Sequence, residues 1–174
     1  MDERTEAGAA IRVEVDDSGL ATLTLSQPER GNPIDGDFCR EFKQAFLRLW
    51  DTEGLRAVLL RAEGKNFSLG GDVKQFYGQR ENLAPLVRQW TSDLHMGLSR
   101  AWTLPVPIIA QVQGYCIAGH NHMAYCCDFT IAADNAVFGQ AGPRVSSPAD
   151  GFFVPYLTKV VGAKKARELW MLCR

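Results

Sequence analysis

The sequence predicts a mixed α/β fold in a single domain that covers residues 1–174. Segments typical of strands and of helices alternate along the chain, as they do in α/β domains. The 174 residues, of which 46% are hydrophobic and 22% charged, are enough to bury one sizeable core. No linker, internal repeat or low-complexity run interrupts the alternation. We therefore expect one α/β domain.

The first part of the chain is predicted to form a hairpin, a helix and a buried strand. Two runs of alternating polarity, 11–15 and 20–25, flank the turn sequence DDSG. Between residues 37 and 50 the hydrophobic side chains recur at helical spacing, which predicts a helix with one buried face. The apolar centre of 56–61 predicts a strand.

The rest of the chain continues the alternation. Helices are predicted over 72–80 and 83–102, and Pro105 and Pro107 follow the second of them. The later predicted elements are a strand at 108–112, a helix at 119–127, a strand at 128–133, and helices at 152–161 and 163–173. Gly162 separates the last two helices.

Charge and hydropathy exclude several classes of function. A net charge of −1 gives no electrostatic basis for binding nucleic acid or an anionic membrane. The longest apolar runs, such as 106–112, are too short to span a bilayer. The first residues lack the basic start and apolar stretch of a secretory signal. Five cysteines without a Cys-x-x-Cys pair argue against a disulfide framework, so we expect a cytoplasmic protein with reduced thiols.

Two glycine-bearing segments carry the strongest indication of function. They are FSLGGD at 67–72 and GYCIAG at 114–119, and each follows a predicted strand and leads into a predicted helix. Such a junction leaves backbone N–H groups without intrahelical acceptors at the helix start. Two junctions that face one point can bind a developing oxyanion, which indicates carbonyl or thioester chemistry. A glycine pair between strand and helix is also typical of a tight turn.

The two segments resemble the signatures of the crotonase (enoyl-CoA hydratase/isomerase) superfamily. The matching stretches are RAVLLRAEGKNFSLGGD at 56–72 and PVPIIAQVQGYCIAGHNHMAYCCDFTIAADNAVFGQAGP at 105–143. The resemblance runs from about residue 11 to the end of the chain. It implies a spiral of ββα units and an enzyme for acyl-CoA thioesters, with coenzyme A as part of the substrate rather than a permanently bound cofactor.

Proteins of this family usually continue into a C-terminal helical region that builds trimers and covers part of the acyl-CoA pocket. The resemblance therefore implies that this region is missing from the 174 residues. It also implies a homo-oligomer, a trimer or a dimer of trimers, if the natural chain is longer.

The resemblance further implies roles for single residues. The oxyanion donors are the backbone N–H groups of Gly71 and Gly119. The positions implied to lie along coenzyme A are Arg30, Ser68, Leu69, Gly70 and Asp72. Two of these have a structural alternative: Asp72 could cap the helix that follows it, and Arg30 could be an exposed arginine without a bound phosphate.

The acid–base residues depart from those of typical hydratases. Those enzymes use two glutamates to add water across a conjugated double bond. Here the two positions are His122 and Gly142, so hydration by that route is not expected. His122 could move a proton near neutral pH, or it could be a partly buried histidine bonded to a backbone carbonyl. His120 and His122 diverge at this helical spacing and lack a third ligand, so no metal is expected.

Residues 138–174 favour one branch of the family. They are most similar to 1,4-dihydroxy-2-naphthoyl-CoA synthases and to ring-opening ketocyclohexane-carboxyl-CoA hydrolases, which also have glycine in place of the second glutamate. The serine of these relatives maps to Ser147, and their catalytic aspartate maps to Ala149, one residue before Asp150. Asp150 could serve as the base after a one-residue shift, or it could form a turn before Gly151.

We therefore expect an acyl-CoA enzyme that stabilises a thioester enolate between Gly71 and Gly119, with His122 or Asp150 moving the proton. The missing glutamates favour carbon–carbon bond formation or cleavage, of Claisen or retro-Claisen type, on a cyclic or branched acyl-CoA. Two alternatives stay open, a generic enoyl-CoA hydratase or isomerase and a non-catalytic acyl-CoA-binding or interaction module. An enolate intermediate serves hydration, isomerisation, and carbon–carbon bond formation or cleavage alike. The fold therefore leaves the reaction open.

Overall fold

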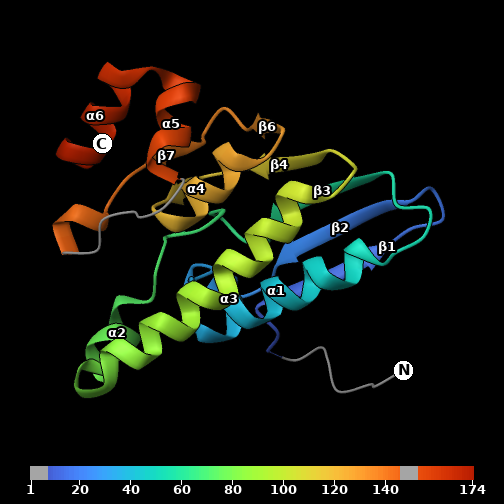
Figure 1. Cartoon of the computed structure of the whole chain (residues 1–174). Helices are drawn as coiled ribbons and strands as arrows, with labels where there is room; N and C mark the ends of the chain where they lie inside the picture. Colours follow the sequence, from blue (N-terminus) through green and yellow to red (C-terminus); the bar gives the residue numbers. More distant parts are fainter. Residues whose placement is uncertain (1–7, 146–152) are drawn as a thin grey trace.

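A five-stranded sheet forms the centre of the computed structural model, which describes residues 8–145 and 153–174 (Figure 1). The strands, in spatial order, are β1 (Ile11–Val15), β2 (Leu20–Leu25), β3 (Ala57–Ala62), β4 (Ile108–Val112) and β6 (Phe129–Ala132). The pair β1–β2 is antiparallel and the other three pairs are parallel. The predicted hairpin and the three later strands are therefore confirmed.

Helix α1 (Gly36–Trp50) begins at a side-chain cap and buries one face. The carboxylate of Asp35 accepts a hydrogen bond from the Phe38 N–H at 2.9 Å. A cap of this kind contributes about 1 kcal/mol to helix stability. The rings of Phe38, Phe42 and Phe46 follow one another at centroid distances of 5.6 and 4.8 Å, all buried. The hydrophobic residues that recur at helical spacing in the sequence therefore form the buried face of α1.

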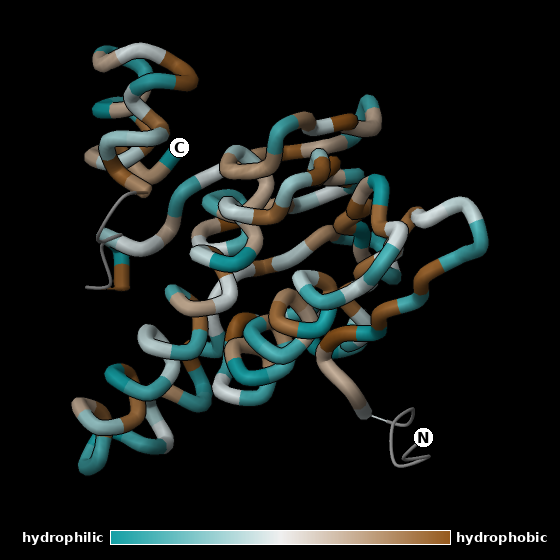
Figure 2. Tube along the Cα trace, turned by 45° about the vertical axis from the view of Figure 1, so that its right-hand side comes forward, coloured by the Kyte–Doolittle hydropathy of each residue, from teal (hydrophilic) through white to brown (hydrophobic). Residues whose placement is uncertain are grey.

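Helix α3 (Leu83–Thr103) lies beside α1 across the sheet (Figure 1). Gly97 allows the close approach, because a Cβ there would lie 2.6 Å from Phe42 Cδ1 and 3.1 Å from Lys43 Cα. In Figure 2, hydrophobic residues follow the strands and recur at intervals along both helices. Within the described ranges, no helix combines the length and hydropathy needed to cross a membrane.

A second sheet, which sequence reasoning missed, pairs β5 (Tyr115–Ile117) with β7 (Val137–Gly139) in parallel. Strands of three residues are too short to show an alternating pattern. The remaining helices are α2 (Val73–Gly78), α4 (Gly119–Cys126), α5 (Phe153–Val161) and α6 (Ala163–Leu172). Short 3-10 turns cover Pro28–Arg30, Arg80–Asn82 and Gly142–Val145. Helices α5 and α6 lie at the end of the molecule away from the N-terminus (Figure 1).

Candidate active site

The two glycine-bearing segments lie side by side, as the oxyanion hypothesis requires. The Ser68 N–H donates to the Tyr115 carbonyl at 2.8 Å, and the Ile117 N–H donates to the Ser68 carbonyl at 3.1 Å. One residue further on, a Cβ at Gly70 would lie 3.1 Å from the Cβ of Ala118. The pairing therefore brings the start of α2 and the start of α4 to one place.

Both proposed donor N–H groups stay outside the backbone hydrogen bonds of the described residues. The Ile34 N–H donates to the Gly70 carbonyl at 2.9 Å, and the Asp72 N–H donates to the Ile34 carbonyl at 3.0 Å. Neither of these two bonds involves the Gly71 N–H. Gly119 opens α4, where first-turn N–H groups have no intrahelical acceptor. Across residues 8–145 and 153–174, neither N–H has a hydrogen-bond acceptor. Both N–H groups can therefore bind a ligand oxygen.

The two glycines differ in how much space surrounds the position of a Cβ. A Cβ at Gly71 would make only ordinary contacts, the nearest with Phe76 Cε2 at 3.4 Å. A Cβ at Gly119 would lie 2.3 Å from Ile34 Cδ1, far inside van der Waals contact. A Cβ at 119 would therefore displace the terminal methyl of Ile34, whereas position 71 has room for a Cβ. Sequence reasoning missed Ile34, because an isoleucine after Pro33 carries no chemical signal.

The turn before α4 contains a strained alanine. Ala118 has φ 54° and ψ −121°, a backbone region that glycine adopts readily and alanine rarely. The Gly139 carbonyl holds the turn, since it accepts hydrogen bonds from the Ala118 N–H at 3.0 Å and from Asn121 Nδ2 at 3.2 Å. These bonds fix where the Gly119 N–H points.

We expect Ala118→Gly to raise the free energy of unfolding by about 1 kcal/mol, because it relieves strain of roughly 1–3 kcal/mol and loses some chain entropy. Urea denaturation followed by circular dichroism measures the change. Ala124→Gly in the buried interior of α4 is the matched control and should destabilise by about 1 kcal/mol. Equal losses in both variants would contradict the strain at Ala118.

The His122 ring faces the C-terminal helices. Its Nε2 lies 3.1 Å from Oε1 of the Gln140 side-chain amide. The rings of Tyr125, Phe153 and Trp170 surround it at centroid distances of 5.7, 4.9 and 5.1 Å. Only 8% of His122 is exposed. The Gln140 side chain and the three rings thus hold the orientation of the His122 ring.

His120 points into the core instead. It is fully buried, with its ring 4.6 Å from that of Phe38 and 6.1 Å from that of Phe67. Neither of its ring nitrogens has a hydrogen-bond partner among the described residues. Burial, with a smaller contribution from His122, lowers the pKa of His120 to about 3. His120 and His122 thus diverge.

Arg30 is bound by two carboxylates. Its guanidinium donates to Asp35 Oδ2 at 2.9 Å and to Asp72 Oδ2 at 2.8 Å. Asp72 also caps α2 by accepting from the Gln75 N–H at 2.9 Å, so the structural alternative for this residue is confirmed. Burial alone would raise the pKa of Asp72, but the bonds from Gln75 and Arg30 outweigh it and hold the pKa below its usual value. One arginine between two aspartates leaves a net negative cluster, a poor site for phosphate.

The other predicted coenzyme A contacts divide into buried and exposed positions. Ser68 is fully buried, and its hydroxyl donates to the Asn32 carbonyl at 2.7 Å and accepts from the Gly70 N–H at 3.0 Å. Leu69 is 52% exposed, and its side chain packs against Gly31, where a Cβ would lie 2.7 Å from Leu69 Cδ1. Asn32, also missed from the sequence, donates from Nδ2 to the Phe67 carbonyl at 3.1 Å. Ser68 and Asn32 therefore shape the loop.

Two predicted catalytic residues, Ser147 and Asp150, lie outside the described residues. Gly142, at the position of the second hydratase glutamate, begins the turn Gly142–Val145.

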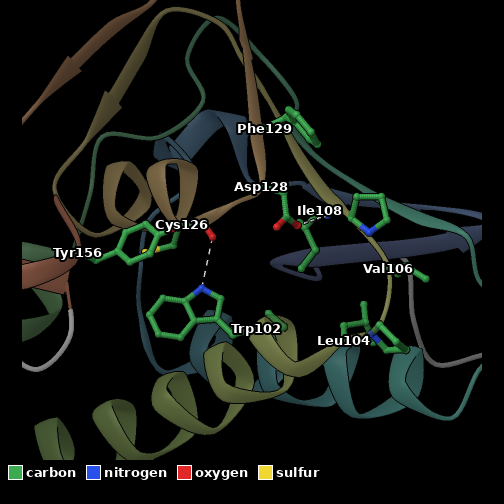
Figure 3. Close-up of a pocket in the computed structure, with 11 residues that line it drawn as sticks. Trp102, Leu104, Val106, Ile108, Cys126, Asp128, Phe129 and Tyr156 are labelled. Carbon is green, nitrogen blue, oxygen red and sulfur yellow. Dashed lines mark hydrogen bonds between the residues drawn. The ribbon is translucent and has the colours of Figure 1, made fainter. Parts of the chain in front are cut away.

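A cavity of about 740 Å³ lies at the far end of α4 (Figure 3). Trp102, Tyr156 and Asp128 line it, and Trp102 Nε1 donates to the Cys126 carbonyl at 3.3 Å. A second cavity of about 590 Å³ lies among α4, β6 and α5. Neither cavity is lined by Gly71 or Gly119, so the candidate site is separate from both.

Comparison with known proteins shows which proteins the chain is similar to. The family described as enoyl-CoA hydratase/isomerase matches residues 16–174. An enoyl-CoA hydratase/carnithine racemase from Magnetospirillum magneticum is 26% identical, with a TM-score of 0.84 over 94% of this chain and 61% of that chain. An enoyl-CoA hydratase from Polaromonas sp. JS666 is 27% identical, with a TM-score of 0.86 over 94% of this chain and 63% of that one.

A third similar structure, from Thermobifida fusca YX, is in complex with acetoacetyl-CoA. It is 26% identical, with a TM-score of 0.85 over 95% of this chain and 67% of that chain. The present chain spans less than two thirds of the length of the first two structures. The predicted crotonase-like α/β fold is confirmed by these similarities.

Proposed function

Since the chain belongs to the enoyl-CoA hydratase/isomerase family, we propose that it binds an acyl-CoA thioester and stabilises its enolate between the N–H groups of Gly71 and Gly119. The observation that carries this proposal is the pairing of two segments whose donor N–H groups have no acceptor among the described residues. Acetoacetyl-CoA in the structure from Thermobifida fusca YX supports the substrate class.

The mechanism begins with the thioester oxygen, which accepts hydrogen bonds from both N–H groups. Negative charge grows on that oxygen as the α-proton leaves, so the donors bind the enolate more strongly than the substrate. The positive end of α4 adds to this effect at Gly119. His122 or Asp150 takes the proton.

For the reaction itself, we propose carbon–carbon bond formation or cleavage, of Claisen or retro-Claisen type, on a cyclic or branched acyl-CoA. Histidine and glycine in place of the two glutamates support it, as does the similarity of residues 138–174 to naphthoyl-CoA synthases and ketocyclohexane-carboxyl-CoA hydrolases. We assign Leu69 to the pantetheine, because it is 52% exposed and lies two residues before the Gly71 donor. Arg30 would meet phosphate only after leaving its two carboxylates.

We further propose that the protein is cytoplasmic and that residues 1–174 form one domain. Burial raises the pKa of Cys39, Cys116, Cys126 and Cys127 to about 12 in each case, which keeps these thiols protonated. Protonated, unreactive thiols suit a protein of the reducing cytoplasm. We propose a homo-oligomer for the natural protein, by analogy with the trimers of the family.

Deuterium uptake at the α-carbon of linear, branched and cyclic acyl-CoA thioesters in heavy water tests the proposal. We expect exchange to be fastest with a branched or cyclic thioester, measured by mass spectrometry. Loss of exchange in His122→Gln but not in Asp150→Asn would identify His122 as the base, and the reverse result would identify Asp150. General-base catalysis is worth about 100- to 10,000-fold.

A folded protein that binds the thioesters but exchanges no proton would contradict the enzyme and favour a non-catalytic acyl-CoA binder. Exchange followed by water addition to an enoyl-CoA would favour a hydratase instead.

A further inference from the structure

We infer that Ile34 is a positioning residue, which fixes the two backbone donors relative to each other. It contacts both glycine-bearing segments, the first through its backbone and the second through its side chain. The inference rests on the proposed function, since it assigns how the donors at Gly71 and Gly119 are held. It does not require Ile34 to touch the reacting atoms.

The backbone of Ile34 holds the Gly71 donor. Its N–H donates to the Gly70 carbonyl at 2.9 Å, and its carbonyl accepts from the Asp72 N–H at 3.0 Å. These two bonds lie on either side of Gly71, so they fix the peptide unit that carries the donor. Rotation of that unit would break at least one of them.

The side chain of Ile34 holds the Gly119 donor. Its Cδ1 lies 2.3 Å from the position of a Cβ at Gly119, and its Cγ1 lies 3.7 Å from the same position. The terminal methyl therefore rests directly on the Gly119 Cα. A β-branched side chain has few accessible χ1 rotamers, so the Cγ1 that carries this methyl is held in place.

Ile34 is itself anchored by its neighbour in the sequence. Asp35 is 1% exposed, caps α1 through the Phe38 N–H and accepts from Arg30. The backbone around Ile34 is thus tied to the core helix α1. A residue anchored in this way that contacts both donor segments constrains the distance between the two N–H groups, which must suit one oxygen atom.

Truncation of Ile34 should therefore slow the chemical step more than it weakens binding. We expect Ile34→Ala to lower kcat for α-proton exchange by about 10- to 100-fold, with KM changed by less than about threefold, because the donors bind charge mainly in the transition state. Ile34→Leu, which keeps a branched side chain of the same size, should recover most of the rate.

Ile109→Ala is the matched control, because Ile109 is half-buried in β4 and lies outside the site. It should leave kcat unchanged at temperatures where the variant is folded. Wild-type exchange with an unchanged kcat in Ile34→Ala would overturn the positioning role alone. Absence of exchange in the wild type would overturn the proposed function and this role with it.

A stability cycle tests the contact without any activity. Gly119→Ala should lower the urea midpoint of unfolding, because the new Cβ meets Ile34 Cδ1. Ile34→Val removes that one atom, so the double variant should unfold with an equilibrium constant at least about fivefold smaller than the two single changes predict together. Gly119 is not among the positive-φ residues, so alanine fits its backbone. Strict additivity would overturn the contact and hence the inference.

Discussion

Replacement of Gly71 by proline is expected to lower the rate of α-proton exchange by about 100- to 1000-fold. Proline lacks the N–H, and loss of one oxyanion donor costs roughly 3–4 kcal/mol of transition-state stabilisation. Within the described part of the chain this N–H has no acceptor, because the bridge to Ile34 is made by the Gly70 carbonyl and the Asp72 N–H. The measurement is kcat for deuterium uptake, with thioester affinity determined separately by titration.

Gly71→Ala is the control that separates the donor from the side chain. A Cβ at this position would make only ordinary contacts, with Phe76 Cε2 at 3.4 Å, so alanine should fold normally and keep exchange within about threefold of wild type. If proline disturbs the fold, a backbone ester at Gly71, which replaces N–H by oxygen, removes the donor with the glycine geometry retained. Full activity in the ester variant would exclude Gly71 as a donor.

Protonation of His120 is expected to make the protein unusually sensitive to mild acid. The native state keeps this ring neutral, because burial lowers its pKa to about 3, whereas the unfolded chain binds a proton near pH 6.5. The free energy of unfolding should therefore be constant above pH 6.5 and fall by about 1.4 kcal/mol per pH unit below it. The full loss down to pH 3 is roughly 4–5 kcal/mol.

Denaturant titrations between pH 7 and pH 4.5 measure this slope. In that window the carboxylates with lowered pKa, such as Asp72 and Asp93, stay ionised and contribute little. His120→Leu should reduce the slope and stabilise the protein at pH 7 by about 1–3 kcal/mol, since it removes two buried polar atoms without partners among the described residues. His95→Gln, on the half-exposed part of α3, should retain the slope.

A wild-type protein whose stability did not change between pH 7 and pH 4.5 would contradict the burial of a neutral His120. An equal slope in His120→Leu would assign the acid sensitivity to another group.

Much of the fold follows from patterns that a single segment contains. The hydrophobic spacing in α1, the alternation in β1 and β2, and the prolines after α3 each depend on neighbouring residues, so the sequence alone predicts them. The strands β5 and β7 were missed, because each has three residues and is defined by its partner. The family likewise follows from two contiguous glycine motifs, whose pairing the structure then places at Ser68 and Cys116.

The detailed arrangement of the site depends on contacts between distant segments, and only the tertiary structure decides those. The sequence could name Arg30 and Asp72 but not their ion pair, which joins residues 42 positions apart. It could name His122 but not Gln140 or the three rings around it.

Ile34 illustrates the division most directly. The sequence determined that glycine stands at 71 and at 119, because those residues are read from the chain itself. The structure decided that a Cβ at 119 would meet the terminal methyl of Ile34, whereas a Cβ at 71 would make only ordinary contacts. The physical reason is that steric exclusion acts between atoms that are close in space. Ile34 and Gly119 are 85 positions apart in the sequence, so only the folded structure shows that they are in contact.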